Sequence, residues 1–331
     1  MSVRRPACPT AYHYRPEDLA GPTAFSCATL YVVGGMYGNP YALDAIQARA
    51  SAEPSPPEIV FNGDFHYLDA DPAAFRAIDD RVRAHHATQG NIEYVLAAAD
   101  DTLGCGCDYP SYVPDAIVAG SDAVVARLRT APAAAEDCSW LAGLPRYLTV
   151  AVGGHRVGIV HGDPENLAGW RLALEAVEPQ QPHIRDRTGF AGTPTTAGQV
   201  LDWFRRAEVE ALCCTHTGLP YAQDFQRPAG RYLVANNGCA GLPDFAGRRH
   251  GVLTRLSVLP GVPGDSLYGL TNAGLRFDAL PVGYDHSRWI TDFLDAWPPG
   301  SPARHNYLHR IEHGTWLTPG HVARGTVTCS P

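Results

Sequence analysis

The sequence lacks any apolar run long enough to cross a membrane. A spanning helix needs about 18 consecutive apolar residues, and no stretch of this chain approaches that length. The N-terminal part also lacks a secretory signal, because Arg4 and Arg5 are followed by Pro, Tyr, His and Glu rather than by an apolar centre. We therefore expect a cytoplasmic protein with no membrane partner.

The sequence also lacks an excess of basic over acidic residues. Lys and Arg together number 26 against 34 Asp and Glu, which gives a net charge of −8. Proteins that coat nucleic acid normally carry the opposite sign, so we expect no nucleic-acid partner. The 331 residues are 45% hydrophobic and 18% charged, which excludes a disordered chain or a coiled coil and allows a sizeable core.

Internal repeats and linker-like stretches are absent as well. We expect one domain at residues 29–297, an N-terminal extension at 1–28, and a C-terminal tail at 298–331 that packs on the domain. His305, His309 and His313 in this tail are spaced by four, which places them on one helix face, expected to be exposed. The nine cysteines are odd in number and follow no export signal, so we interpret them as reduced thiols.

Short β-like runs alternate with helical patterns in the first half of the chain, which predicts an α/β fold with a mainly parallel sheet at its start. Helix starts are indicated at Asn39-Pro40 and Asp71-Pro72, where a capping side chain precedes proline. Gly153-Gly154 predicts a hairpin turn, and a further helix is expected at about 196–208. The strands are expected at 29–33, 58–61, 147–152, 156–160, 211–214, 231–235 and 251–256.

Polar residues follow several of these strands directly, at glycine-rich loops. The four that could bind a metal are Asp64, Asn91, His161 and His216. Ligands in α/β folds bind beyond the carboxyl ends of strands, and this mixture of oxygen and imidazole donors suits Mn, Fe or Zn. Each residue also has a structural interpretation: Asp64 and Asn91 could cap turns or helices, and either histidine could hydrogen-bond within the core.

The order of the segments resembles the motif series of calcineurin-like metallophosphoesterases. Residues 33–43 stand where that family has Asp-x-His-Gly-Asn, Gly63-Asp64 matches Gly-Asp-x-x-Asp at its bridging aspartate, and residues 90–93 are similar to Gly-Asn-His-Glu. His161-Gly162 fits the lone histidine, residues 215–220 resemble Gly-His-Thr-His-Leu-Pro, and residues 236–243 resemble the Asn-Pro-Gly-Ser segment that follows.

The resemblance implies two mixed β-sheets flanked by helices, with two metal ions at the strand ends. It also implies hydrolysis of a small phosphate ester or phosphodiester by a metal-bound hydroxide, as in a phosphatase. Asp64, Asn91, His161 and His216 would then be the ligands of the second metal ion. The first metal ion would need side chains that Gly35, Tyr37 and Gly218 replace. One site is therefore expected to be intact and the second is doubtful.

The family's general acid is also replaced, because Ile92 stands where that histidine would be. We expect His66 or Tyr37 to assist the leaving group or the oxyanion. Cys105 and Cys107 form a Cys-Gly-Cys segment between glycines, which could replace the missing ligands, react in non-phosphate chemistry, or simply form a tight turn. The hypotheses are a hydrolase, a degenerate metal- or ligand-binding domain, and a repurposed enzyme that uses the two cysteines.

Overall fold

The computed structural model describes residues 9–98, 100–130, 138–228 and 230–328. The first eight residues of the expected N-terminal extension and the last three of the expected tail lie outside the described residues. Within the described parts of the chain, no helix is long and apolar enough to cross a membrane.

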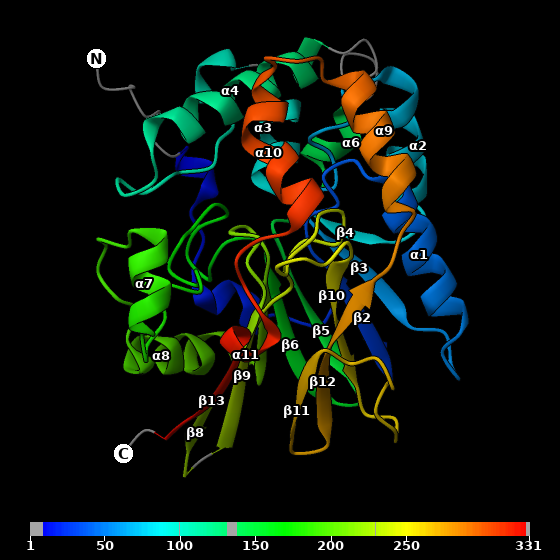
Figure 1. Ribbon diagram of the computed structural model, residues 1–331. Helices are drawn as coiled ribbons and strands as arrows, with labels where there is room; N and C mark the ends of the chain where they lie inside the picture. The colour runs from blue at the N-terminus through cyan, green and yellow to red at the C-terminus, as the bar shows by residue number, and fades with distance from the viewer. Residues whose placement is uncertain (1–8, 99, 131–137, 229, 329–331) are drawn as a thin grey trace.

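Two mixed sheets form the centre of the molecule (Figure 1). The six-stranded sheet has the order β11 (Tyr268–Asn272), β12 (Leu275–Val282), β10 (Gly251–Ser257), β2 (Thr29–Val33), β3 (Glu58–Asn62), β4 (His86–Thr88). The seven-stranded sheet has the order β1 (Ser26–Cys27), β5 (Tyr147–Val152), β6 (His155–Val160), β7 (Ala211–Cys214), β9 (Gly230–Asn236), β8 (Tyr221–Arg227), β13 (Ala323–Thr328).

Helices cover the outer faces and the ends of the sheets. In Figure 1, α1 (Pro40–Ser51), α2 (Pro72–Val82) and α9 (His286–Ala296) lie on one side, while α7 (Pro182–Thr188) and α8 (Ala197–Ala207) lie on the other. Above the strands are α3 (Asn91–Ala97), α4 (Asp115–Thr130) and α10 (Pro302–His313). The short helices are η1 (Thr10–Tyr12), η2 (Pro16–Ala20), η3 (Asp101–Leu103), α6 (Ser139–Ala142) and α11 (Pro319–Val322).

Strand β2 shows why the sheets stack in layers. Its five residues are all buried. Because successive side chains point to opposite faces of the sheet, they pack into two different hydrophobic cores. Leu30 and Val32 join the core cluster that contains strand residues of both sheets. Tyr31 and Val33 join the cluster that packs against α1, α2 and α9. The six-stranded sheet is therefore the middle layer, covered on both faces, as expected for parallel strands.

Parallel pairing places the ends of the important strands together. In one sheet β2 pairs with β3 and β3 pairs with β4, all parallel. In the other sheet β6 pairs with β7, also parallel. The carboxyl ends within each group therefore meet at one edge, and the loops that leave them carry the polar residues singled out from the sequence.

Most of the predicted elements are present within two residues of the expected bounds. Asn39 caps α1 through Tyr41 and Ala42 backbone N–H groups, and Asp71 caps α2. Gly153 and Gly154 have φ of 56° and 93° and turn the chain between the antiparallel strands β5 and β6. Sequence patterns did not reveal α4, α9, or the strands β8, β11, β12 and β13.

The tail forms regular structure that packs on the remainder. Helix α10 packs against α4, and β13 adds an edge strand parallel to β8. The three histidines of α10 are exposed, as predicted. The division at residues 28 and 298 itself stays a prediction.

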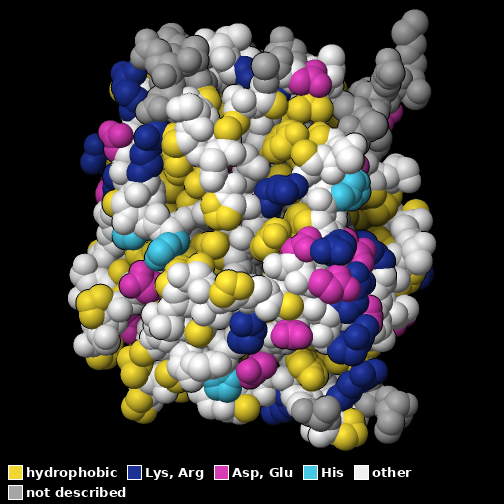
Figure 2. All heavy atoms as spheres, turned by 180° about the vertical axis from the view of Figure 1, so that it is seen from behind, with side chains coloured by type: hydrophobic (Ala, Val, Ile, Leu, Met, Phe, Trp, Pro, Cys, Tyr) yellow, Lys and Arg dark blue, Asp and Glu magenta, His cyan; other side chains and the backbone are white. Residues whose placement is uncertain are grey.

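All cationic side chains other than histidine are arginine, since the sequence contains no lysine. On the face seen in Figure 2, arginines and acidic residues are interspersed, and hydrophobic side chains are scattered between them. Ion pairs between partly exposed side chains include Arg81–Asp44, at 2.8 Å.

Candidate metal centre

The loop after β3 positions Asp64. Gly63 and Asp64 both take left-handed backbone conformations, with φ of 73° and 53°. A β-carbon on Gly63 would lie 2.5 Å from the Gly90 Cα and 2.6 Å from the His161 Nδ1, so only glycine fits here. An aspartate held at positive φ is unusual, and such conformations concentrate at functional sites.

The carboxylate of Glu93 fixes this loop from α3. It accepts hydrogen bonds from the backbone N–H groups of Asp64 at 2.8 Å, Phe65 at 3.0 Å and Gly90 at 2.9 Å. Three N–H groups that no regular element satisfies are thereby paired, as buried donors require. Burial and the charge of Asp64 raise the pKa of Glu93 to about 7. Glu93 therefore positions the loop and does not face the centre as an acid.

Hydrogen bonds to backbone carbonyls set the orientation of the two histidines. His161 Nδ1 lies 2.8 Å from the carbonyl oxygen of Asn62, and His216 Nε2 lies 3.0 Å from that of Cys107. A carbonyl only accepts, so each of these nitrogens carries the proton and the other nitrogen of each ring has a free lone pair. Those two lone pairs face each other, with His161 Nε2 and His216 Nδ1 3.3 Å apart.

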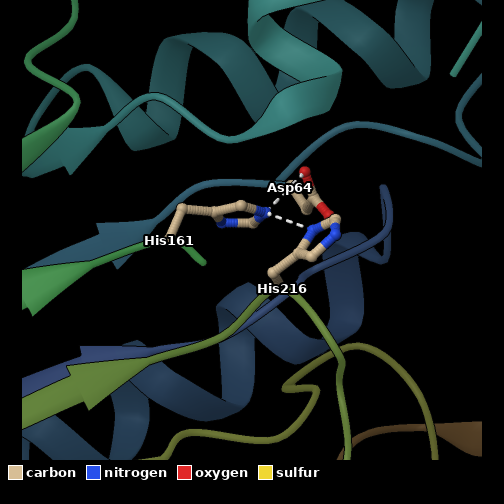
Figure 3. A group of neighbouring side chains, drawn as sticks. All are labelled: Asp64, His161 and His216. Carbon is tan, nitrogen blue, oxygen red and sulfur yellow. Dashed lines mark hydrogen bonds and ion pairs between the residues drawn. The ribbon is translucent and has the colours of Figure 1, made fainter. Parts of the chain in front are cut away.

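Two oxygens complete the arrangement. Asn91 donates its amide N–H to the carbonyl of Cys105 at 2.9 Å, which turns its Oδ1 toward His161 Nε2 at 3.1 Å. Asp64 Oδ1 lies 3.4 Å from the same nitrogen. Figure 3 shows Asp64 and His216 converging on this atom of His161, and their ligand atoms lie within 4.8 Å of one another.

The donor set fits a small divalent cation. In a tetrahedral site with bonds of about 2.0–2.1 Å, neighbouring ligand atoms lie about 3.3 Å apart, which matches the 3.1–3.4 Å around His161 Nε2. One proton on this nitrogen could serve only one of its three neighbours, whereas a cation serves all of them. The structure thus brings together the four residues predicted from the sequence, three from loops and one from the start of α3: Asp64, His161, His216 and Asn91.

Burial tunes the charges of these ligands. His216 is almost fully buried, and this burial, followed by repulsion from a protonated His161, lowers the pKa of His216 to about 4. Burial favours the neutral ring of His161, but Asp64 outweighs burial and raises the pKa of His161, so a bound cation would take the place of a proton on Nε2. Burial alone would raise the pKa of Asp64, but the adjacent His161 and His216 hold it below its usual value. A neutral imidazole and an ionised carboxylate are the forms that bind metal ions.

Tyr37 lies beside the centre. Its backbone N–H donates to the carbonyl of Asp64 at 3.1 Å, and its hydroxyl would be 3.5 Å from a β-carbon placed on Gly218. Burial, and then the neighbouring Cys239, raises the pKa of Tyr37 well above 10. The phenol therefore keeps its proton and serves as a hydrogen-bond donor rather than as a phenolate ligand.

His66 points elsewhere. Its Nδ1 lies 2.6 Å from Asp69 and its Nε2 3.3 Å from Asp79, so both ring nitrogens are engaged in a buried cluster. The ring also stacks on Phe75, with centroids 3.7 Å apart. The predicted role at a leaving group is not supported by this geometry, because neither nitrogen is available to a substrate.

The Cys-Gly-Cys segment packs against the intact ligands. Cys107 Sγ lies 3.3 Å from the Asn91 amide nitrogen, and the Cys107 carbonyl accepts hydrogen bonds from both His216 and Trp170. Burial raises the pKa of the Cys107 thiol, which disfavours the thiolate that nucleophilic or metal-binding chemistry requires. The segment orients Asn91 and His216 through its carbonyls.

Three contributors were not foreseen from the sequence: Trp170, Cys239 and Arg310. Trp170 has its ring 5.5 Å from that of His216. Arg310 lies on α10, far from every motif in the sequence, and reaches Gly218 and Asp244. A motif scan could have found Cys239, which stands at the serine position of the Asn-Pro-Gly-Ser resemblance, but no local pattern marks the other two.

No protein-family model and no curated protein matches the sequence. A hypothetical protein from Pyrococcus horikoshii is similar in structure, with 18% identity and a TM-score of 0.54 over 87% of this chain and 99% of that one. A metallophosphoesterase from Sphaerobacter thermophilus has 15% identity and a TM-score of 0.51 over 87% of this chain and 100% of its own. The chain has the calcineurin-like metallophosphoesterase fold, as its motifs predicted.

Proposed function

We propose that this protein is a metal-dependent hydrolase that acts on a small phosphate ester or phosphodiester. The observation that carries the proposal is the convergence of four lone-pair donors, Asp64 Oδ1, Asn91 Oδ1, His161 Nε2 and His216 Nδ1, at the ends of parallel strands. A Mn, Fe or Zn ion held there would lower the pKa of a coordinated water and polarise a phosphoryl oxygen.

The chain's own residues prepare this centre before any ligand arrives. The carbonyls of Asn62 and Cys107 fix the tautomers of His161 and His216, and the Glu93 carboxylate fixes the loop that carries Asp64. Side chains preorganised in this way need little rearrangement when they bind a cation.

Proton donation falls to Tyr37 in this proposal. Ile92, which replaces the family's acid, has no titratable group and is buried in the core. Tyr37 is half-buried, protonated and adjacent to the Gly218 side of the centre. It would donate a hydrogen bond to a phosphoryl oxygen or to the leaving oxygen of the substrate.

A domain that binds metal or phosphate without turnover is the second candidate. The observation that favours it is the loss of side chains at Gly35 and Gly218, combined with the isoleucine at position 92. A positioned acid is typically worth about 10²- to 10⁴-fold in rate, so its replacement bears directly on turnover.

The cysteines support a reducing compartment such as the cytoplasm for this activity. The seven cysteines that the structure describes are all free thiols, whereas secreted proteins usually pair theirs.

The test is metal content and hydrolysis measured on the same untagged protein, purified without chelators. We expect about one ion per chain by mass spectrometry, and Mn-dependent hydrolysis of bis-p-nitrophenyl phosphate or p-nitrophenyl phosphate. Asp64→Asn should lose both, because it removes a charged ligand. His309→Ala, which removes an exposed histidine of α10, should change neither.

The outcomes separate the two candidates. One ion per chain without turnover of either substrate would favour the binding domain. Absence of bound metal after reconstitution with Mn, Fe and Zn would overturn the proposal, because nothing would then fill the centre.

A further inference from the structure

Two of the three positions at which the family's first metal ligands are missing, Gly35 and Gly218, face one group of side chains, and the third position is Tyr37 itself. A β-carbon on Gly35 would run into the ring of Tyr37, whose Cδ2 would be 3.0 Å away. A β-carbon on Gly218 would meet Cys239 Sγ at 2.8 Å, Tyr37 Oη at 3.5 Å and Arg310 Nη1 at 3.9 Å. The space into which the missing ligands would point is thus occupied by Tyr37, Cys239 and Arg310.

The guanidinium of Arg310 is held rigidly there. Its Nε donates to the carbonyl of Pro243 at 3.1 Å, and its Nη2 donates to the carbonyl of Gly218 at 3.0 Å and to Asp244 Oδ1 at 2.6 Å. Asp244 is fully buried, and its other oxygen accepts the Cys239 backbone N–H at 2.9 Å. These contacts leave Nη1 on the side of Gly218, where the guanidinium also interacts with the thiol of Cys239.

Helix α10 carries this arginine to the centre on one face. Tyr307, three residues earlier and therefore on the same side of the helix, places its hydroxyl 3.2 Å from that of Tyr67. The ring of Tyr307 lies 6.2 Å from that of Tyr37. The side chain of Arg310 remains 19% exposed, so it is held within the fold and can still be reached from solvent.

The donor set at this position does not fit a metal ion. Gly35 and Gly218 offer no side chain at two of the three ligand positions. A guanidinium is charged at every accessible pH and offers only donors. A second metal ion would therefore lack two ligands and would meet the fixed positive charge of Arg310 beside Gly218.

We propose that Arg310 takes the place of the family's first metal ion, as a built-in cation that binds phosphoryl oxygens beside a single ion held by Asp64, Asn91, His161 and His216. This inference rests on the proposed function. Because Nε and Nη2 already donate to Pro243, Gly218 and Asp244, the guanidinium would bind a phosphoryl oxygen through Nη1 and through its permanent charge. The ion pair with Asp244 fixes the orientation of the guanidinium.

The test measures binding of Mn and of inorganic phosphate by calorimetry, with metal counted by mass spectrometry. Wild-type protein and Arg310→Met should each hold about one Mn per chain. Arg310→Met should bind phosphate about 10- to 100-fold more weakly, the range expected for loss of a charge-assisted hydrogen bond. Arg310→Lys should recover part of this loss, since it restores the charge without the guanidinium's fixed orientation.

Two further variants keep the result interpretable. Arg310→Met leaves the buried Asp244 unpaired, so Arg310→Met combined with Asp244→Asn removes the pair together and should show the same loss of phosphate affinity in a folded protein. Arg205→Met removes an exposed arginine of α8 and should bind phosphate as the wild type does.

The inference is overturned if wild-type protein binds two Mn ions, or if phosphate affinity stays within about twofold of wild type in both Arg310 variants that lack the charge. Either result leaves the proposed function standing. Absence of Mn at the Asp64 centre, with phosphate binding that still depends on Arg310, would instead overturn the proposed function and retain the arginine as an anion site.

Discussion

Gly63 shows how strictly one backbone position controls this centre. Its positive φ permits the turn after β3, and the absence of a β-carbon lets His161 Nδ1 and the Gly90 backbone approach. The same approach aligns His161 with the carbonyl of Asn62. The metal centre therefore depends on a residue that offers no ligand.

We expect Gly63→Ala to destabilise the protein by about 3 kcal/mol, from the strained φ and the collision with Gly90 and His161. It should also weaken metal binding, because His161 must move. The measurements are the urea midpoint and a Mn titration. Gly189→Ala is the matched control: φ is 70° there, but nothing lies within 4 Å of the added carbon, so a loss of only about 1 kcal/mol is expected. Equal losses in the two variants would contradict the packing argument.

At the residue scale, the sequence predicted those site residues whose position relative to a strand or helix can be seen from the neighbouring residues. Asp64, Asn91, His161 and His216 each directly follow a strand or open a helix, so their place at a strand end was visible from pattern alone. The direction of His66 was not, because four residues beyond the end of β3 the loop turns its ring toward Asp69 and Asp79. Arg310 could not be found either, since it meets Gly218 across 92 residues.

At the scale of elements, His66 ties the loop after β3 to α2. Burial favours its neutral ring, but Asp69 and Asp79 outweigh burial and raise the pKa of His66 to about 9. Asp79 also accepts a hydrogen bond from Trp140 of α6 at 2.8 Å. A loop, two helices and one charged imidazole therefore form a connected unit behind the metal centre.

This unit predicts a pH dependence of stability. The folded pKa of His66 lies above its unfolded value of 6.5, so its contribution is complete below pH 6.5 and is lost as the pH rises through about 9. The loss should amount to about 3 kcal/mol. Unfolding free energies measured between pH 6 and pH 10 check this expectation.

His66→Gln should flatten that part of the profile, because glutamine cannot carry the charge. The exposed His309, replaced in the same way, is the control. A profile for His66→Gln that still falls by the wild-type amount over this interval would assign the pH dependence to other groups.

Elements differ in how well the sequence foretold them. A capping side chain followed by proline indicates a helix start within two residues, as at Asn39-Pro40 and Asp71-Pro72. The structure forms the capping hydrogen bonds at both places. Strand β13 carries no such signal: it is largely exposed and pairs with β8, which lies just over a hundred residues earlier in the sequence. Elements that form through pairing with residues distant in the sequence are hard to predict from the local pattern of residue types.

At the scale of the whole molecule, the centre joins the two sheets. Asp64 and Asn91 follow β3 and β4 of the six-stranded sheet, whereas His161 and His216 follow β6 and β7 of the seven-stranded sheet. The Asn62 side chain bridges the same gap, donating to the carbonyl of Val160 at 2.8 Å. An ion bound by all four ligands would therefore connect the layers at one edge.

We expect Mn to stabilise the entire fold for this reason. At a free concentration 100 times its dissociation constant, the ion should add about 2.7 kcal/mol to the unfolding free energy. Thermal unfolding with Mn and with EDTA gives the measurement. The shift should vanish in Asp64→Asn and persist in His309→Ala; a shift of the same size in Asp64→Asn would mean that the ion binds elsewhere.

The placement of Arg310 has a consequence for where the two positive charges of the proposed site come from. A metal ion must be acquired from the surroundings and can be withdrawn by a chelator or exchanged for another metal. A guanidinium on α10 is made with the polypeptide and is in position as soon as the helix docks. In the proposed centre one of the two cations is thus encoded in the sequence, and only the other would depend on the metal supply of the cell.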